Sequence, residues 1–128
     1  MTTTVYDRML AEMPIGLDRA LLRVLSFHAG KKNALGRDLL VAGIHLEGFN
    51  VSERQARQCI HDLRRKGILI CSTPGEAGGY YMASNLDEFR EFIDRELHPK
   101  AIDMLETESA MKDAARQQFG EASQPGLM

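Results

Sequence analysis

The sequence has few of the residues that build metal sites. It contains no tryptophan and only two cysteines, Cys59 and Cys71, which lie twelve positions apart and form no CxxC pair. A structural zinc site needs four Cys or His ligands at short spacings, and the four histidines of this chain are scattered. We therefore expect no metal and no cofactor, and two small buried thiols that behave as hydrophobic residues.

Long apolar runs are also lacking. The first residues, Met1 to Thr4, are not a basic segment leading into an apolar one, and no apolar stretch approaches the roughly 20 residues that a transmembrane helix needs. These absences predict a soluble, cytoplasmic protein that does not associate with a membrane.

The chain is long enough for one hydrophobic core, and its charge is unevenly divided. With 128 residues, of which 44% are hydrophobic, a single domain is the expectation. The net charge of −2 combines 11 Lys and Arg against 8 Asp and Glu in residues 1–85 with 5 against 10 in residues 86–128. A basic first part and an acidic second part indicate two roles, one of which involves a polyanion.

Two helices are predicted in the first third of the chain. Apolar residues repeat at helical spacing from Leu17 until Gly30, since glycine suits the left-handed position just after a helix. A shorter helical pattern runs over Leu35–Ala42, and Gly43 interrupts it. No regular pattern is recognisable over residues 1–16, which we expect to be a separate N-terminal segment.

The segment Ser52–Lys66 is predicted to be a basic, amphipathic helix. Ser52 and Gln55 form a capping box at its start, and Gly67 ends it. Its apolar stripe consists of Ala56, Cys59, Ile60 and Leu63. Its opposite side and the flanks of that side carry Arg54, Arg57, Gln58, His61, Arg64 and Arg65. Arginine can hold a phosphate or the major-groove edge of guanine with two hydrogen bonds, and glutamine can do the same on adenine, so this side is a candidate DNA-binding surface.

A change of period after Gly67 predicts a β-hairpin and then a long helix. The expected strands, 68–72 and 80–83, flank a glycine-rich loop. The long helix begins after Ser84-Asn85, and Pro99 either kinks it or opens a new helix.

Three helices and one hairpin are too few elements for two domains, so the fold class is predicted to be α+β, one compact unit with a C-terminal helical extension. The expected divisions are an N-terminal segment over 1–16, one domain over 17–84, one or more C-terminal helices over 85–118 and a flexible tail over 119–128.

The order of elements and the wording of residues 52–84, SERQARQCIHDLRRKGILICSTPGEAGGYYMAS, resemble the winged helix-turn-helix fold, a three-helix core with a β-hairpin wing. The likeness is closest to the DNA-binding module of biotin-repressor-type regulators and of small phage or prophage proteins, and it covers Leu17–Ser84. It implies that Leu35–Ala42 is the first helix of the helix-turn-helix and that Ser52–Lys66 is its recognition helix, which lies in the major groove.

The resemblance also implies that Pro74–Gly79 is the tip of the wing. This loop departs from a wing that contacts DNA, because it carries Glu76 and no Lys or Arg. The link from Ala42 to Ser52 is also longer than the roughly three- or four-residue turn of simple helix-turn-helix proteins.

The sequence therefore predicts specific binding of double-stranded DNA, as a transcriptional regulator or as a DNA-binding protein of a phage or other mobile element. The groove-facing candidates are Arg54, Arg57, Gln58, His61 and Arg65, and the phosphate candidates are Arg64, Lys66, Lys31 and Lys32. With about six phosphate contacts, affinity should fall about a thousandfold between about 50 and 200 mM salt. The alternative is a winged-helix module that binds another protein, which the negative net charge and the wing without basic residues favour.

The acidic helix after residue 85 carries a second candidate surface. Its apolar stripe, at heptad-like spacing, consists of Leu86, Phe89, Ile93, Leu97, Ile102 and Leu105. This helix either packs against its own domain or pairs with a second copy. Pairing would make the protein a homodimer and bring two recognition helices to neighbouring half-sites.

No pattern in the sequence predicts catalysis. No serine stands in a nucleophile-elbow pattern, and GEAGG at 75–79 lacks the Lys-Ser/Thr that follows in a phosphate-binding loop. Paired carboxylates such as Asp87-Glu88 belong to a polar helix face. We therefore expect no enzyme, and no small-molecule ligand because there is no second domain of any size to sense one.

Overall fold

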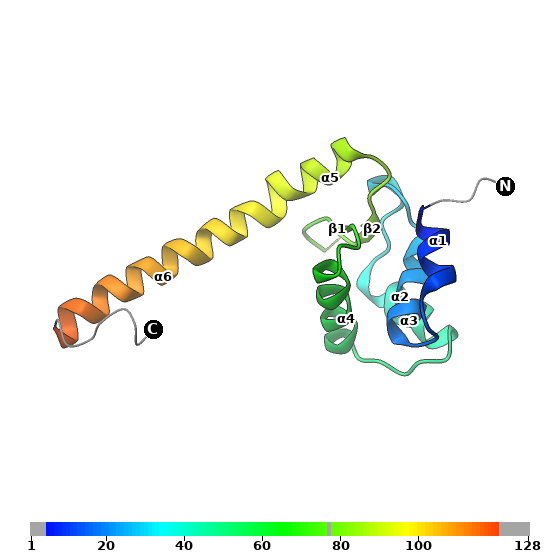
Figure 1. Ribbon diagram of the computed structural model, residues 1–128, viewed down its shortest axis with the longest axis horizontal. Helices are drawn as coiled ribbons and strands as arrows, with labels where there is room; N and C mark the ends of the chain where they lie inside the picture. The colour runs from blue at the N-terminus through cyan, green and yellow to red at the C-terminus, as the bar shows by residue number, and fades with distance from the viewer. Residues whose placement is uncertain (1–4, 77, 121–128) are drawn as a thin grey trace. The chain divides into compact units, whose positions relative to one another are not determined.

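The computed structural model describes residues 5–76 and 78–120, and the chain divides into two units, residues 1–92 and 93–128. The elements of the first unit are α1 (Val5–Glu12), α2 (Leu17–Ser26), the 3₁₀ turn η1 (Lys31–Asn33), α3 (Arg37–Leu46), α4 (Glu53–Arg65), β1 (Ile70–Ser72), β2 (Tyr80–Met82) and α5 (Leu86–Phe92). The second unit contains the π-helical turn η2 (Ile93–Leu97) and α6 (His98–Phe119) (Figure 1). The chain is therefore α+β, with a two-stranded antiparallel hairpin and a long C-terminal helix, as predicted.

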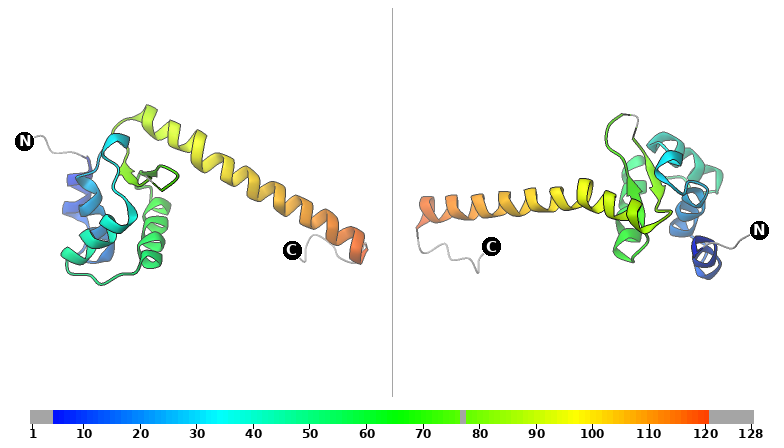
Figure 2. Two further views of the ribbon diagram at one scale, coloured as in Figure 1. Left: turned by 180° about the vertical axis from the view of Figure 1, so that it is seen from behind. Right: turned by 90° about the horizontal axis from the view of Figure 1, so that it is seen from above.

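Helix α1 was not predicted, and it belongs to the first unit. Tyr6 is buried, and its hydroxyl donates a hydrogen bond to the carbonyl oxygen of Ala83 at 2.6 Å. Figure 1 and Figure 2 show α2 between α1 and α4, and α2 contacts both. Eight residues are too few for a helix to be stable alone, so α1 depends on these tertiary contacts rather than on its own sequence pattern. The structured unit thus begins before residue 17.

Helices α2 and α3 pack closely because of a glycine. The core between them includes the fully buried Leu21, Leu25 and Ile44. Gly43 does not interrupt the helix, contrary to the prediction: α3 continues through it to Leu46. A Cβ atom at Gly43 would lie 2.9 Å from Cγ1 of Val24, so the glycine allows the close approach of α3 to α2.

Helix α4 begins and ends where the sequence predicts. Ser52 Oγ accepts a hydrogen bond from the Gln55 amide at 3.1 Å, and Gln55 Oε1 accepts one from the Ser52 amide at 2.8 Å, which completes the capping box. Gly67 takes a positive φ of 91° directly after the helix. The predicted apolar stripe is buried and consists of Ala56, Cys59, Ile60 and Leu63. It packs toward α2, α3 and β1, so the opposite side of α4 is left to the solvent.

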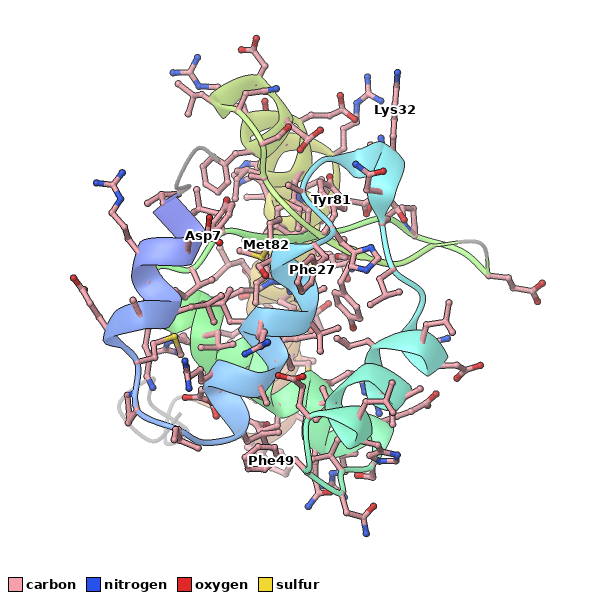
Figure 3. All side chains as sticks on the ribbon, turned by 90° about the vertical axis from the view of Figure 1, so that its right-hand side faces the viewer. Asp7, Phe27, Lys32, Phe49, Tyr81 and Met82 are labelled. Atoms are coloured by element: carbon pink, nitrogen blue, oxygen red, sulfur yellow. The ribbon has the colours of Figure 1, made fainter. Side chains whose placement is uncertain are left out.

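The hairpin is shorter than predicted, and β2 is bordered on both edges. Along one edge of β2, Met82 pairs with Ile70 of β1. Along the other edge lies the segment that precedes α3. There the Gly30 amide donates to Met82 O and the Leu35 amide to Tyr80 O, both at 2.8 Å. This third segment was not predicted, because its pairing is nonlocal and its sequence has no strand alternation. Met82 is fully buried as a result and lies inside the unit (Figure 3).

The C-terminal part is not one uninterrupted α-helix. Asn85 Oδ1 accepts a hydrogen bond from the Glu88 amide at 2.8 Å and caps α5, as the sequence predicts. The π-helical turn η2 then precedes α6, and Pro99 lies in the first turn of α6. Proline has no N–H for the carbonyl four residues earlier and its ring clashes there, so a wider turn at this point relieves the conflict.

Two other predictions concern the ends of the chain and membranes. The predicted tail over 119–128 falls mostly outside the described residues, and α6 itself continues to Phe119. Within the described ranges, no helix is long and apolar enough to cross a bilayer.

Candidate nucleic-acid interface

The exposed side of α4 brings most of the predicted site together. We define the arginine face as Arg54, Arg57, Gln58, His61 and Arg65, all of which are exposed. The four residues on the buried side have at most 4% of their surface exposed, which fixes the rotation of the helix about its axis. The five side chains therefore project from one rigid element, with a hydrophobic anchor behind them.

Among the described residues, none pairs with the arginines of this face. Elsewhere, basic residues lie in ion pairs, such as Arg23 Nε with Glu47 Oε1 at 3.2 Å. By contrast, Arg54, Arg57 and Arg65 form no ion pair with any residue of the described ranges. Their charge is therefore available to an external anion such as a phosphate group.

The two non-arginine members of the arginine face differ in their surroundings. Gln58 Nε2 donates a hydrogen bond to Asp62 Oδ1 at 3.0 Å, one helical turn along α4. This bond orients the amide along the helix, and its exposed position lets the amide exchange this partner for a base edge. His61 is exposed and has no hydrogen bond with any described residue.

Arg64 does not have the predicted phosphate-binding environment. Its Nε donates to the carbonyl oxygen of Ile70 at 2.7 Å, one Nη lies 3.4 Å from Ser72 Oγ, and the guanidinium stacks 5.1 Å from the ring centre of Phe92. Burial lowers the pKa of this guanidinium, although it stays protonated. The residue therefore ties α4 to β1 and α5, which sequence spacing did not reveal because Ile70 and Phe92 come from elements further along the chain.

Lys66 is likewise engaged inside the first unit. Its Nζ lies 3.1 Å from Asp18 Oδ2, and the other carboxylate oxygen of Asp18 accepts a hydrogen bond from the Cys59 thiol at 3.1 Å. Asp18 joins α2 to α4.

The two cysteine thiols resist ionisation. Burial and the hydrogen bond to Asp18 raise the pKa of Cys59 to about 12, and burial raises the pKa of Cys71 to about 11. Both thiols are buried, as the sequence predicts.

The predicted phosphate contacts Lys31 and Lys32 lie on η1, away from α4. Lys31 Nζ pairs with Glu91 Oε1 at 2.7 Å, and the Lys31 amide donates to Glu88 Oε2 at 3.0 Å, so η1 lies beside α5. Lys32 points into the solvent at the end of the unit opposite Phe49 (Figure 3). The structure therefore does not join these lysines to the arginine face.

One basic residue that sequence reasoning missed lies next to this face. Arg37, at the first position of α3, lines the same small hollow as Arg57 and Tyr80. It also lines a groove of about 440 Å³ between α3 and the hairpin loop, where Glu76 lies as well. The sequence analysis placed the start of this helix at Leu35, so it did not show that Arg37 is the first residue of the helix. Gly36, which directly precedes α3, is the signal that could have identified this position.

The hairpin loop beside this groove has a fixed turn. The Thr73 amide donates to Gly79 O, and the Gly79 amide donates to Thr73 Oγ1, both at 2.9 Å. A Cβ atom at Gly78 would lie 2.2 Å from the carbonyl oxygen of Thr73, so a side chain there is incompatible with the turn. The loop offers backbone groups rather than positive charge to the groove.

The predicted dimerisation stripe is divided among three elements. Leu86 and Phe89 belong to α5, Ile93 and Leu97 to η2, and Ile102 and Leu105 to α6. The π-helical turn changes the spacing between these groups, so they do not form one regular heptad stripe. On α6, Leu105 is 60% exposed and Ile102 is 39% exposed.

No family model, curated protein or solved structure matches this chain. Within residues 5–76 and 78–120, no group of His, Cys, Asp and Glu side chains is arranged to hold a metal ion.

Proposed function

We propose that the first unit is a winged helix-turn-helix domain that binds double-stranded DNA. In this proposal α3 and α4 are the helix-turn-helix, α4 is the recognition helix in the major groove, and the β1–β2 hairpin is the wing. The observation that carries the proposal is the arginine face: three exposed arginines, without an ion pair to any residue that the structure describes, and a glutamine on a helix whose other side is buried. Helices of this kind read base edges with Arg and Gln.

The contacts within the chain reduce the number of cations available to phosphates. Arg64, Lys66 and Lys31 have partners in the protein, whereas Arg37 joins Arg54, Arg57 and Arg65. If these four arginines of one copy met phosphates, the affinity of a single copy would fall on the order of 10² between about 50 and 200 mM salt. This salt dependence is shallower than the thousandfold drop that the sequence alone predicts.

The test is selection of bound duplexes from a random DNA pool at two salt concentrations, followed by affinity measurements on the selected site. The double variant Arg54→Ala/Arg65→Ala should lose specific binding, since each bidentate base contact contributes about 1–3 kcal/mol of discrimination. Arg23→Ala is the matched control, because it removes a surface arginine that already pairs with Glu47. Retained binding by the double variant would show that α4 is not the DNA-binding helix.

A second candidate function, protein binding, is favoured by a different surface. Leu39 and Leu46 of α3 are 64% and 88% exposed and lie seven positions apart, on one side of the helix. Exposed leucines at this spacing are typical of a surface that another protein covers. Absence of salt-sensitive retention on duplex DNA, together with loss of a protein partner in Leu39→Ser/Leu46→Ser, would favour this function over DNA binding.

A further inference from the structure

Asp62 determines which way the amide of Gln58 points. Gln58 Nε2 donates a hydrogen bond to Asp62 Oδ1 at 3.0 Å, and both residues are exposed on α4, four positions apart. A carboxylate only accepts hydrogen bonds, so the amide atom that faces Asp62 must be the nitrogen. The amide is therefore held in one of its two possible orientations, with its oxygen directed away from Asp62.

The bond to Asp62 leaves part of the amide available. A primary amide has two N–H donors and one oxygen acceptor, and this bond uses a single N–H. Asp62 forms no ion pair with a lysine or arginine of the described residues, so no cation competes with Gln58 for its carboxylate. Gln58 can thus present one donor and one acceptor to a base without giving up its bond to Asp62.

The bases differ in how well they fit this donor and acceptor. Adenine presents an N6 amino donor and an N7 acceptor in the major groove, and these match the oxygen and the second N–H of the amide. Guanine presents two acceptors, N7 and O6, so the oxygen of the fixed amide would face another acceptor. To bind guanine the amide must turn over, which places its oxygen against the carboxylate of Asp62 and breaks their hydrogen bond.

We propose that Asp62 sets the base specificity of Gln58, so that Gln58 binds adenine and disfavours guanine. This inference rests on the proposed function, because it requires α4 to lie in the major groove. Asp62 is a positioning residue, since it contacts Gln58 and not the base. The three arginines of the arginine face only donate and fit guanine, so the bound sequence should combine guanine positions with one adenine that Gln58 contacts.

Affinities for duplexes that differ at one base pair are the main test. Gln58→Ala identifies the position, because it should remove discrimination at one base pair of the selected duplex. At that position the native chain should bind adenine about tenfold or more tightly than guanine. Asp62→Asn should bring the two affinities within about threefold of each other, because asparagine donates as well as accepts and permits both orientations of the amide.

The matched control is Glu53→Gln, which removes one negative charge from the same helix but not the partner of Gln58. Both variants should bind all duplexes somewhat more tightly, since each reduces repulsion from the phosphates, but only Asp62→Asn should change the ratio of adenine to guanine affinity. The inference alone fails if that ratio survives in Asp62→Asn, if another base is preferred, or if Gln58→Ala alters no position. A native chain that binds no duplex contradicts the proposed function as well.

The hydrogen bond itself is tested without DNA. In NMR spectra of the free chain, the side-chain amide signals of Gln58 should shift in Asp62→Asn and stay in place in Glu53→Gln. Unchanged signals in Asp62→Asn would mean that the carboxylate does not hold the amide. That result overturns the inference whether or not the arginine face binds DNA.

Discussion

Two neighbouring arginines at the end of α4 have the same charge but different surroundings. Arg64 is partly buried and donates to the Ile70 carbonyl, whereas Arg65 is exposed and has no ion pair in the described residues. Residue type and helical position alone predicted a DNA contact for both. The difference arises because only Arg64 lies on the edge of α4 that meets β1 and α5.

Alanine substitution should separate these two roles. Arg64→Ala leaves the Ile70 carbonyl without its donor and removes the stacking on Phe92, so the free energy of unfolding should fall by about 1–3 kcal/mol. Arg65→Ala should change it by less than about 0.5 kcal/mol but weaken DNA binding about tenfold or more. Urea unfolding and fluorescence anisotropy with a selected duplex measure the two effects. Equal stability losses in both variants would mean that Arg64 has no structural role.

The buried thiols predict a loss of stability in mild alkali. A thiol in the unfolded chain ionises near pH 8.5, whereas burial and the hydrogen bond to Asp18 raise the pKa of Cys59 to about 12 in the folded chain. Between these values the unfolded state has lost a proton that the folded state keeps. The free energy of unfolding therefore falls as pH rises, by up to about 1.4 kcal/mol per pH unit for this thiol.

Urea unfolding at pH 8, 9 and 10 measures this decline. The stability is fully present below about pH 8, and the decline should be shallower in Cys59→Ala, because only one of the two thiols, Cys71, whose pKa is raised to about 11, then contributes to it. A native chain whose stability stayed constant or rose over this range would show that Cys59 is not held protonated.

At the scale of elements, local patterns predicted what local contacts determine. The capping box at Ser52 and the buried stripe of α4 follow from residues within one helix, and the structure has both. The sequence did not reveal α1, whose Tyr6 bonds to Ala83, or the segment ending at Leu35 that borders β2. These features depend on partners far away in the chain, which periodicity does not register.

Gly43 shows the same limit, and it makes a testable case. Glycine in mid-helix suggested a helix end, but a Cβ atom there would meet Cγ1 of Val24 at 2.9 Å, so close helix packing explains it. Gly43→Ala should therefore destabilise the native chain, since the clash, about 1–3 kcal/mol, outweighs the gain in helix propensity of about 1 kcal/mol.

In a Val24→Ala background the clash is relieved, and Gly43→Ala should become stabilising by up to about 1 kcal/mol. Urea unfolding of the four variants of this cycle gives the coupling between the two sites. The same sign of effect in both backgrounds would show that Val24 is not what excludes a side chain at residue 43.

At the scale of the whole molecule, the buried core of the described residues belongs to the first unit. Every buried residue of the described ranges lies between Tyr6 and Phe92, and α6 contributes none. The basic and acidic parts of the sequence follow nearly the same division. Stability and the arginine face thus belong to the first unit, whereas Ile102 and Leu105 of the predicted dimerisation stripe belong to the second.

A chain that ends at residue 97 tests this division. It keeps every buried residue of the described core, so its Tm should equal that of the full chain, but it lacks α6 and should be a monomer by light scattering. The slope of log affinity against log salt should fall by about half, because one arginine face instead of two then releases counterions from the DNA. An unchanged slope with a monomeric fragment would show that only one arginine face of the dimer touches DNA. A large drop in Tm would show that α6 supports the first unit, contrary to the confinement of the buried residues to Tyr6–Phe92.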